Sequence, residues 1–231
     1  MEVQSGDLIK TNGTGMVQLV FVDETKIVIG PNASMVLEVT MLRNREKADN
    51  FAVKALGGSF RFISGKSRKK AYKITTPTAT MGIRGTTFDF WVADHKQTSV
   101  IILSGAVRMC GQARTCKSFS GDCSYMSTDS RGQVGIVEPG QDATRAVQAG
   151  FPFLLNQSDL REGFQADTAS CGKYVAVAVK KTKAVVDDTT PYDPGSGASD
   201  EPEPDAPEPD APEPDVPDKP DRPSQPAPSK P

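Results

Sequence analysis

Four cysteines are the residues whose spacing says most about chemistry in this chain. Cys110, Cys116, Cys123 and Cys171 are separated by five, six and forty-seven residues. Structural zinc sites usually place ligands in pairs two to four residues apart, so this spacing argues against zinc. Four cysteines allow three disulfide pairings. We favour Cys110–Cys116, which closes a short loop, and Cys123–Cys171, which ties a late segment back; both bonds need an oxidising compartment.

Catalytic patterns are missing from the sequence. The one histidine, His95, lies in 92–97, which reads as a hairpin turn where a solvated side chain is expected. There is no G-x-S-x-G elbow, P-loop or dinucleotide fingerprint. Asp23, Glu24 and Glu38 could be imagined as paired carboxylates, but strand and turn positions predict exposed side chains. We therefore predict a protein that is not an enzyme and needs no cofactor.

A basic cluster consists of Lys66, Arg68, Lys69, Lys70 and Lys73. It could meet an acidic protein surface, lipid phosphate or this chain's own acidic tail, and a solvated loop is the default interpretation. Nucleic acid is not expected, because the rest of the chain is only modestly basic and no recognised binding module surrounds the cluster.

Residues 75–90, TTPTATMGIRGTTFDF, join two strand patterns through glycine turns. Phe88 and Phe90 should share one face of a strand, with Asp89 and Trp91 on the other, because successive β side chains alternate. Pro77 favours extended geometry before it, and the glycines allow tight turns. The segment is predicted to be a kinked β connection.

Alternating patterns of this kind dominate residues 8–145, separated by turn signals such as Asn12-Gly13 and Gly57-Gly58. This spacing predicts an all-β fold, either a solenoid-like or a sandwich-like stack of short strands. We expect one short helix near 157–165 and a closing strand at 173–181.

Nine residues of the segment 75–90 resemble the signature of the FecR domain, the periplasmic part of a bacterial signalling family. These signature residues are Thr76, Pro77, Ala79, Gly82, Ile83, Arg84, Gly85, Thr86 and Phe88. The similarity extends over residues 5–110. It implies an all-β fold built coil on coil. In that family the domain senses the signalling part of an outer-membrane transporter and controls a sigma factor.

Arg84 within the signature and Trp91 just after it are candidates for partner contact. Arg84 has five donors that could satisfy backbone carbonyls at a tight bend, which would be a structural role, or it could contact a partner directly. Trp91 could anchor a partner, or it could close a second small core. The basic residues Lys66, Arg68, Lys69 and Lys70 are further candidates.

The end of the chain has a different composition. Of the 18 prolines, 14 lie at or after Pro191, and residues 192–231 carry three basic and eleven acidic side chains, a net charge of −8. Such a segment is predicted to be a disordered tail or spacer. We expect a FecR-like β domain at 5–145, an extension packed on it at 146–187, and the tail at 188–231.

The first residues, MEVQSGDL, contain no export signal, and no run is long and apolar enough to cross a bilayer. We nevertheless expect a periplasmic or secreted protein whose export signal is absent from the chain as given. The leading hypothesis is a non-enzymatic interaction domain with a protein partner in the cell envelope, linked to sigma-factor signalling. The alternative is a structural or glycan-binding envelope module with a tail spacer.

Overall fold

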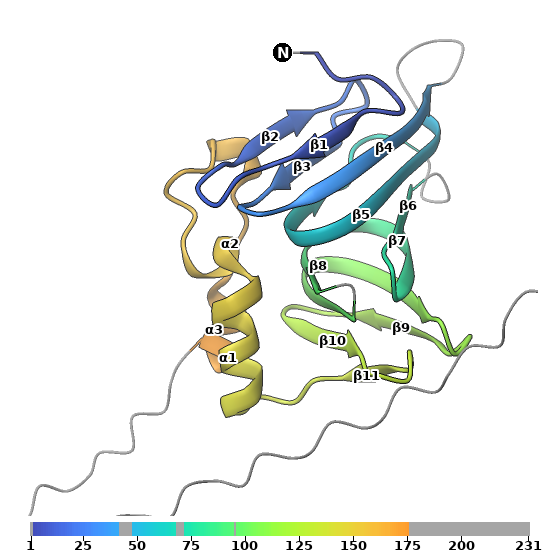
Figure 1. Cartoon of the computed structure of the whole chain (residues 1–231). Helices are drawn as coiled ribbons and strands as arrows, with labels where there is room; N and C mark the ends of the chain where they lie inside the picture. The colour runs from blue at the N-terminus through green and yellow to red at the C-terminus, as the bar shows by residue number, and fades with distance from the viewer. Residues whose placement is uncertain (1, 42–47, 68–71, 95, 176–231) are drawn as a thin grey trace, which may run out of the picture. The chain divides into compact units, whose positions relative to one another are not determined.

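The structure is a computed structural model that describes residues 2–41, 48–67, 72–94 and 96–175 (Figure 1). The chain divides into two compact units, Met1–Lys181 and Thr182–Pro231. The predicted acidic tail and His95 lie outside the described residues.

Strands make up most of the described secondary structure. They are β1 (Leu8–Lys10), β2 (Val17–Val20), β3 (Lys26–Ile29), β4 (Ser34–Met41), β5 (Ala48–Ile63), β6 (Tyr72–Thr75), β7 (Ala79–Ala93), β8 (Gln97–Gly111), β9 (Cys116–Ser120), β10 (Ser124–Thr128) and β11 (Val134–Ile136). The helical segments are α1 (Gln141–Gly150), α2 (Pro152–Leu155), the 3-10 turns η1 (Glu162–Phe164) and η2 (Ala169–Cys171), and α3 (Gly172–Val175).

All the described strands belong to one mixed sheet. Its main path runs β1-β4-β5-β6-β7-β8-β10-β11, with β3 on β5, β2 on β3 and β9 on β8. The β5–β6 pair is parallel and the other pairs are antiparallel. The prediction of an all-β fold is confirmed.

The long strands change partners part-way along. The first half of β5 pairs with β4 and β6, whereas its last residues pair with β3 and β7. In the same way β8 pairs with β10 through residues 99–102 and with β9 through 106–110. Each long strand therefore takes part in two portions of the one mixed sheet (Figure 1).

The main core lies inside this folded sheet. Phe60 and Phe62 from β5 and Phe88 and Phe90 from β7 are at most 1% exposed and stack on one another, as with the Phe60 and Phe90 rings at 4.8 Å. These are the faces that the alternation predicted. Arg61 and Asp89 lie on the opposite face of these two strands, with Val28 of β3 paired to Arg61, and that face would meet water if nothing covered it.

Residues 141–175, here called the C-terminal extension, cover that outer face. Ala143 and Val147 of α1 pack in a second core with Ile101 and Tyr125 of the sheet. The helix predicted at 157–165 is wrong in extent, because only η1 is helical there. Helix α1 was not predicted, and it runs across the expected boundary at 145/146.

The end of the described chain also differs from expectation. Residues 173–175, which were expected to begin a strand, lie in helix α3. Tyr174 is buried against Tyr125, with ring centroids 5.4 Å apart, and its hydroxyl donates to the Val137 carbonyl. These contacts and the adjacent Cys171 hold a helical turn where alternation alone predicts a strand. Residues 176–181 of the predicted strand lie outside the described residues.

Candidate interaction surface

Two strands near the start of the chain leave one backbone edge without a strand beside it. Within the described ranges β1 pairs with β4 alone and β2 with β3 alone. Both lie at the end of the sheet that carries the N-terminus (Figure 1). Open edges present N–H and C=O groups that can pair with another chain.

A hydrogen bond at the β2–β3 turn shows which β2 residues direct their backbone N–H and C=O groups toward β3. The Phe21 amide donates to the Thr25 carbonyl at 2.8 Å, so Phe21 faces β3. Because hydrogen-bonded and non-hydrogen-bonded positions alternate in an antiparallel pair, Leu19 also faces β3. The N–H and C=O groups of Gln18 and Val20 therefore point away from the sheet, toward the open edge.

The β2 edge carries no protection against strand pairing. Edge strands are usually blunted by lysine, proline or a bulge. Residues 16–22, MVQLVFV, contain no charge, proline or glycine. Val20 is 60% exposed and Val22 70%, and both are among the most exposed large hydrophobic side chains in the described part of the chain. We call residues 17–22 the β2 edge from here on.

A groove of about 530 Å³ runs beside the β2 edge. Its lining comes from residues 2–5, 18–22 and Leu37. Leu19 and Phe21 are only partly buried and pack against the main core. The inner face of the edge is therefore apolar and incompletely covered, which suits alternate side chains of an added strand.

The signature turn is the register shift at residues 84–87 within β7, and Thr86 holds it in place. Its hydroxyl donates to the Ala106 carbonyl at 2.7 Å and accepts from the Ala106 amide, while the Thr86 amide donates to Ser64 Oγ. Gly105, at φ +85°, lies so close that an added Cβ would be 2.1 Å from the Gly85 carbonyl oxygen. The turn is thus a close crossing of two backbones.

The other threonine of the signature is also buried. The Thr76 hydroxyl lies 2.6 Å from that of Thr98 and accepts from the Ala79 amide, and Pro77 contributes its carbonyl to Gln112. Gly82 pairs in the ladders between β6, β7 and β8. Thr76 and Pro77 therefore close the bend before β7, whereas Gly82 lies within that strand.

Arg84 does not play the structural role expected of it. Its side chain is exposed, and among the described residues it makes no hydrogen bond or ion pair. Thr86 satisfies the carbonyl at the bend in its place. Direct partner contact by Arg84 stays a prediction.

The structure describes the two ends of the basic cluster, Lys66 and the exposed Lys73 of β6, whereas Arg68, Lys69 and Lys70 lie outside the described residues. Lys66 forms an exposed ion pair with Glu24. The loop is anchored by Asp23, which is buried and accepts from Ser67 Oγ at 2.5 Å and from the Tyr72 hydroxyl at 3.0 Å. Burial, as the largest cause, raises the pKa of Tyr72. Asp23 therefore serves the fold.

Trp91 closes the second core. An added Cβ at Gly150 would lie 2.1 Å from Trp91 Cδ2, so the end of α1 rests directly on the indole, and the Phe151 ring is 6.5 Å away. Trp91 also lines a groove of about 610 Å³ that includes Asn32 and Asp94. The Trp91 indole therefore does not present an uncovered aromatic face to a partner.

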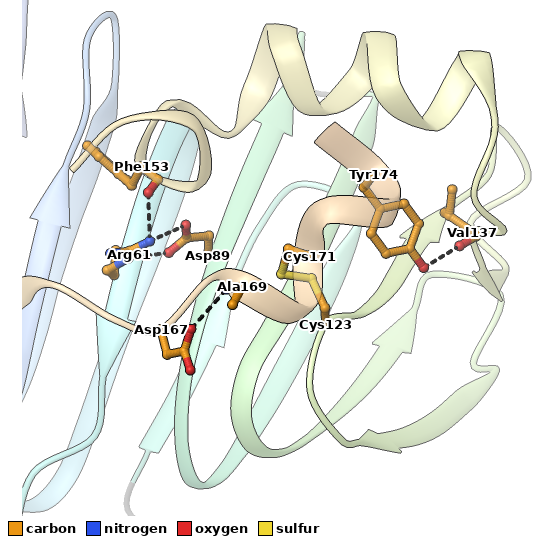
Figure 2. The surroundings of a disulfide bond; sticks show 9 residues. All are labelled: Arg61, Asp89, Cys123, Val137, Phe153, Asp167, Ala169, Cys171 and Tyr174. Atoms are coloured by element: carbon orange, nitrogen blue, oxygen red, sulfur yellow. Dashed lines mark hydrogen bonds and ion pairs between the residues drawn. A yellow bond between two sulfur atoms is a disulfide. The ribbon is translucent and has the colours of Figure 1, made fainter. Parts of the chain in front are cut away.

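A buried ion pair within the sheet also holds the C-terminal extension, through further hydrogen bonds of its arginine. Sequence reasoning did not predict it. Arg61 and Asp89, opposite one another on β5 and β7, make a two-pronged contact: Nε to Oδ1 at 2.6 Å and Nη2 to Oδ2 at 2.8 Å. Arg61 also donates to the Phe153 carbonyl (Figure 2). It donates further to the Phe164 carbonyl and to Gln157 Oε1. Burial raises the pKa of Asp89, and the guanidinium opposes that rise. The only sequence signal was a charged residue on each strand at facing positions.

Both disulfides are present with the favoured pairing. Cys110–Cys116 links β8 to β9, and Cys123–Cys171 fastens the extension to the sheet beside β10 (Figure 2). Cys123 and Cys171 are each 1% exposed. The second bond therefore ties residues 141–175 to the same face that Arg61 holds.

No group of three or more His, Cys, Asp or Glu side chains in the described ranges could hold a metal ion. Within these ranges, too, no helix is long and apolar enough to span a bilayer.

Comparison with known proteins gives a family for the sheet. No curated protein matches the chain. Two crystal structures of a protein from Parabacteroides distasonis ATCC 8503 assigned as an anti-sigma factor match with 13% and 14% identity and TM-scores of 0.46 and 0.45, each over 62% of this chain and 64% of the solved chain. Residues 7–108 match the sequence model of the FecR protein family. These are the residues that carry β1 to β7, most of β8, the signature turn and the β2 edge, and they are a FecR domain.

Proposed function

We propose that this chain is a non-enzymatic, periplasmic interaction protein that acts in cell-surface signalling linked to sigma-factor regulation. The FecR domain supports the signalling role, because the family it defines works through protein contacts. The two disulfides support the location, because such bonds persist in oxidising compartments and are rare in the cytosol.

The open β2 edge is the observation that carries the contact mechanism. A partner supplies an extended segment that pairs with the outward backbone groups of Gln18 and Val20, as in strand addition elsewhere. Backbone hydrogen bonds provide affinity. The groove of about 530 Å³ beside Leu19 and Phe21 receives the partner's inward side chains and provides specificity.

Capture from an envelope extract tests this proposal with three versions of the chain. Val20→Pro removes the outward N–H donor while leaving the β3 side of the strand intact. Val20→Thr keeps the donor and the β propensity and is the matched control. The wild type and Val20→Thr should retain a sigma regulator or the signalling part of an outer-membrane transporter, identified by mass spectrometry, and Val20→Pro should not.

Equal retention of that partner by folded Val20→Pro would contradict strand addition at β2. If retention of the partner is instead lost with Arg84→Ala, the contact lies at the signature turn, where the Arg84 side chain is exposed. Circular dichroism of each variant controls for folding.

A second candidate is binding of an envelope glycan in the groove beside Trp91. The groove supports it because Asn32, Asp94 and Gln148 bring polar groups next to an aromatic ring. Retention on insoluble peptidoglycan or envelope polysaccharide that falls with Asn32→Ala and Asp94→Ala would favour this function. Retention of protein partners alone would discard it.

A further inference from the structure

We propose that the β2 edge also pairs with the β2 edge of a second copy of this chain, so that self-association covers the partner site. The regulatory meaning rests on the proposed function; the pairing itself is a separate statement about this molecule. The symmetry of the edge, its side chains and its lack of charge all favour the pairing.

Backbone parity makes the edge self-complementary. Gln18 and Val20 direct their N–H and C=O groups outward, as the Phe21–Thr25 hydrogen bond requires. An antiparallel pair with a two-fold axis at Val20 sets Val20 opposite Val20 of the other copy. The two valines then exchange both hydrogen bonds, and Gln18 lies opposite Val22 on each side.

The same register matches the side chains on both faces. On the inner face, Leu19 of one copy meets Phe21 of the other, and both are only partly buried in the single chain. On the outer face the exposed Val20 side chains, each 60% exposed, lie next to each other. Cross-strand pairs of β-branched and aromatic side chains stabilise antiparallel sheets.

Electrostatics and geometry favour a closed dimer. Like charges directly opposite each other destabilise a strand pair, and residues 16–22 carry none. A two-fold contact uses the same patch on both copies, so pairing leaves no free β2 edge for further growth. A partner strand must therefore compete with the second copy for the same backbone groups.

Chemical cross-linking of the full chain tests the register. Val20→Cys places a thiol on the proposed axis, and Ile136→Cys on the edge strand β11, where Ile136 is 61% exposed, is the matched control. The native cysteines are all in disulfides and do not react with maleimides. A short bismaleimide should join Val20→Cys into a dimer and leave Ile136→Cys monomeric. Equal cross-linking of the two variants would overturn the proposal.

Sedimentation equilibrium measures the pairing itself. Val20→Pro removes one donor per copy, hence two hydrogen bonds per dimer, and should weaken dimerisation about 30-fold, with Val20→Thr close to wild type. A wild-type chain that stays monomeric at all concentrations would overturn self-pairing whatever the capture assay shows. If the dimer forms but no partner strand competes with the second copy for the β2 edge, self-pairing is supported and the proposed function is contradicted.

Discussion

Replacing Arg61 by methionine should destabilise the protein more than any change to a surface charge. The side chain is fully buried, and its removal leaves the Asp89 carboxyl without its cation and the carbonyls of Phe153 and Phe164 without a donor. Removing one partner of a buried pair costs about 3–5 kcal/mol, and we expect about 4 kcal/mol at pH 7. Methionine is unbranched and fills a similar volume, so the loss is chiefly electrostatic.

The matched control is Lys54→Met. Lys54 and Glu38 form an ion pair at 3.4 Å between neighbouring strands, but each side chain is 50% exposed. Exposed pairs contribute about 0.2–1 kcal/mol, so this variant should lose less than about 1 kcal/mol. A double variant, Arg61→Met with Asp89→Leu, should recover about half of the loss, because no unpaired charge is then buried.

Urea unfolding followed by the fluorescence of Trp91, the one tryptophan, reports on this face directly. With a slope of about 2 kcal/mol/M, the midpoint for Arg61→Met should fall by about 2 M. Without the guanidinium, burial raises the pKa of Asp89 unopposed, so folding favours the protonated carboxyl. The stability contributed by the protonated Asp89 carboxyl is present below the ordinary pKa near 3.8 and is lost as pH rises. Arg61→Met should therefore lose less stability at pH 4 than at pH 7. A loss equal to that of Lys54→Met at both pH values would refute the reasoning.

Further changes test the turn, the disulfide and a buried hydroxyl. Gly105→Ala should lose at least about 2 kcal/mol in urea unfolding, because φ is +85° and the added Cβ meets backbone, whereas Gly135→Ala, with nothing within 4 Å, should lose under about 1 kcal/mol. Replacing Cys123 and Cys171 by alanine should cost about 4 kcal/mol by the chain-entropy estimate, and unchanged thermal unfolding would contradict it. Burial raises the pKa of Tyr125, so its contribution to stability is lost above pH 10; Tyr125→Phe should flatten that fall in alkaline urea titrations.

Sequence reasoning was most successful where the signal is local. The alternation in 86–92 identified the face of Phe88 and Phe90 that fills the core, and the signature residues identified the FecR domain. It did less well in the extension. Helix α1 has a weak signal, since its inward residues Ala143 and Val147 are few and Gly140 offers no side-chain cap. Local alternation also predicted a strand where Tyr174 lies in a helical turn.

Arg84 and Arg61 show why burial could not be read in advance. The signature drew attention to Arg84, which is exposed, while Arg61, in an ordinary strand pattern, is fully buried. The difference is made by residues 153–164, about a hundred positions further along the chain, which cover one face of β5 and β7.

The amino-acid sequence by itself determined which side chains share a strand face and where the chain turns, because these depend on near neighbours and on the two-residue period of a strand. Only the tertiary structure decided that the outer face of β5 and β7 is dry and that β2 is left with an open edge. Covering a face or pairing an edge depends on which distant segment packs there, and that contact has no signature in the local pattern.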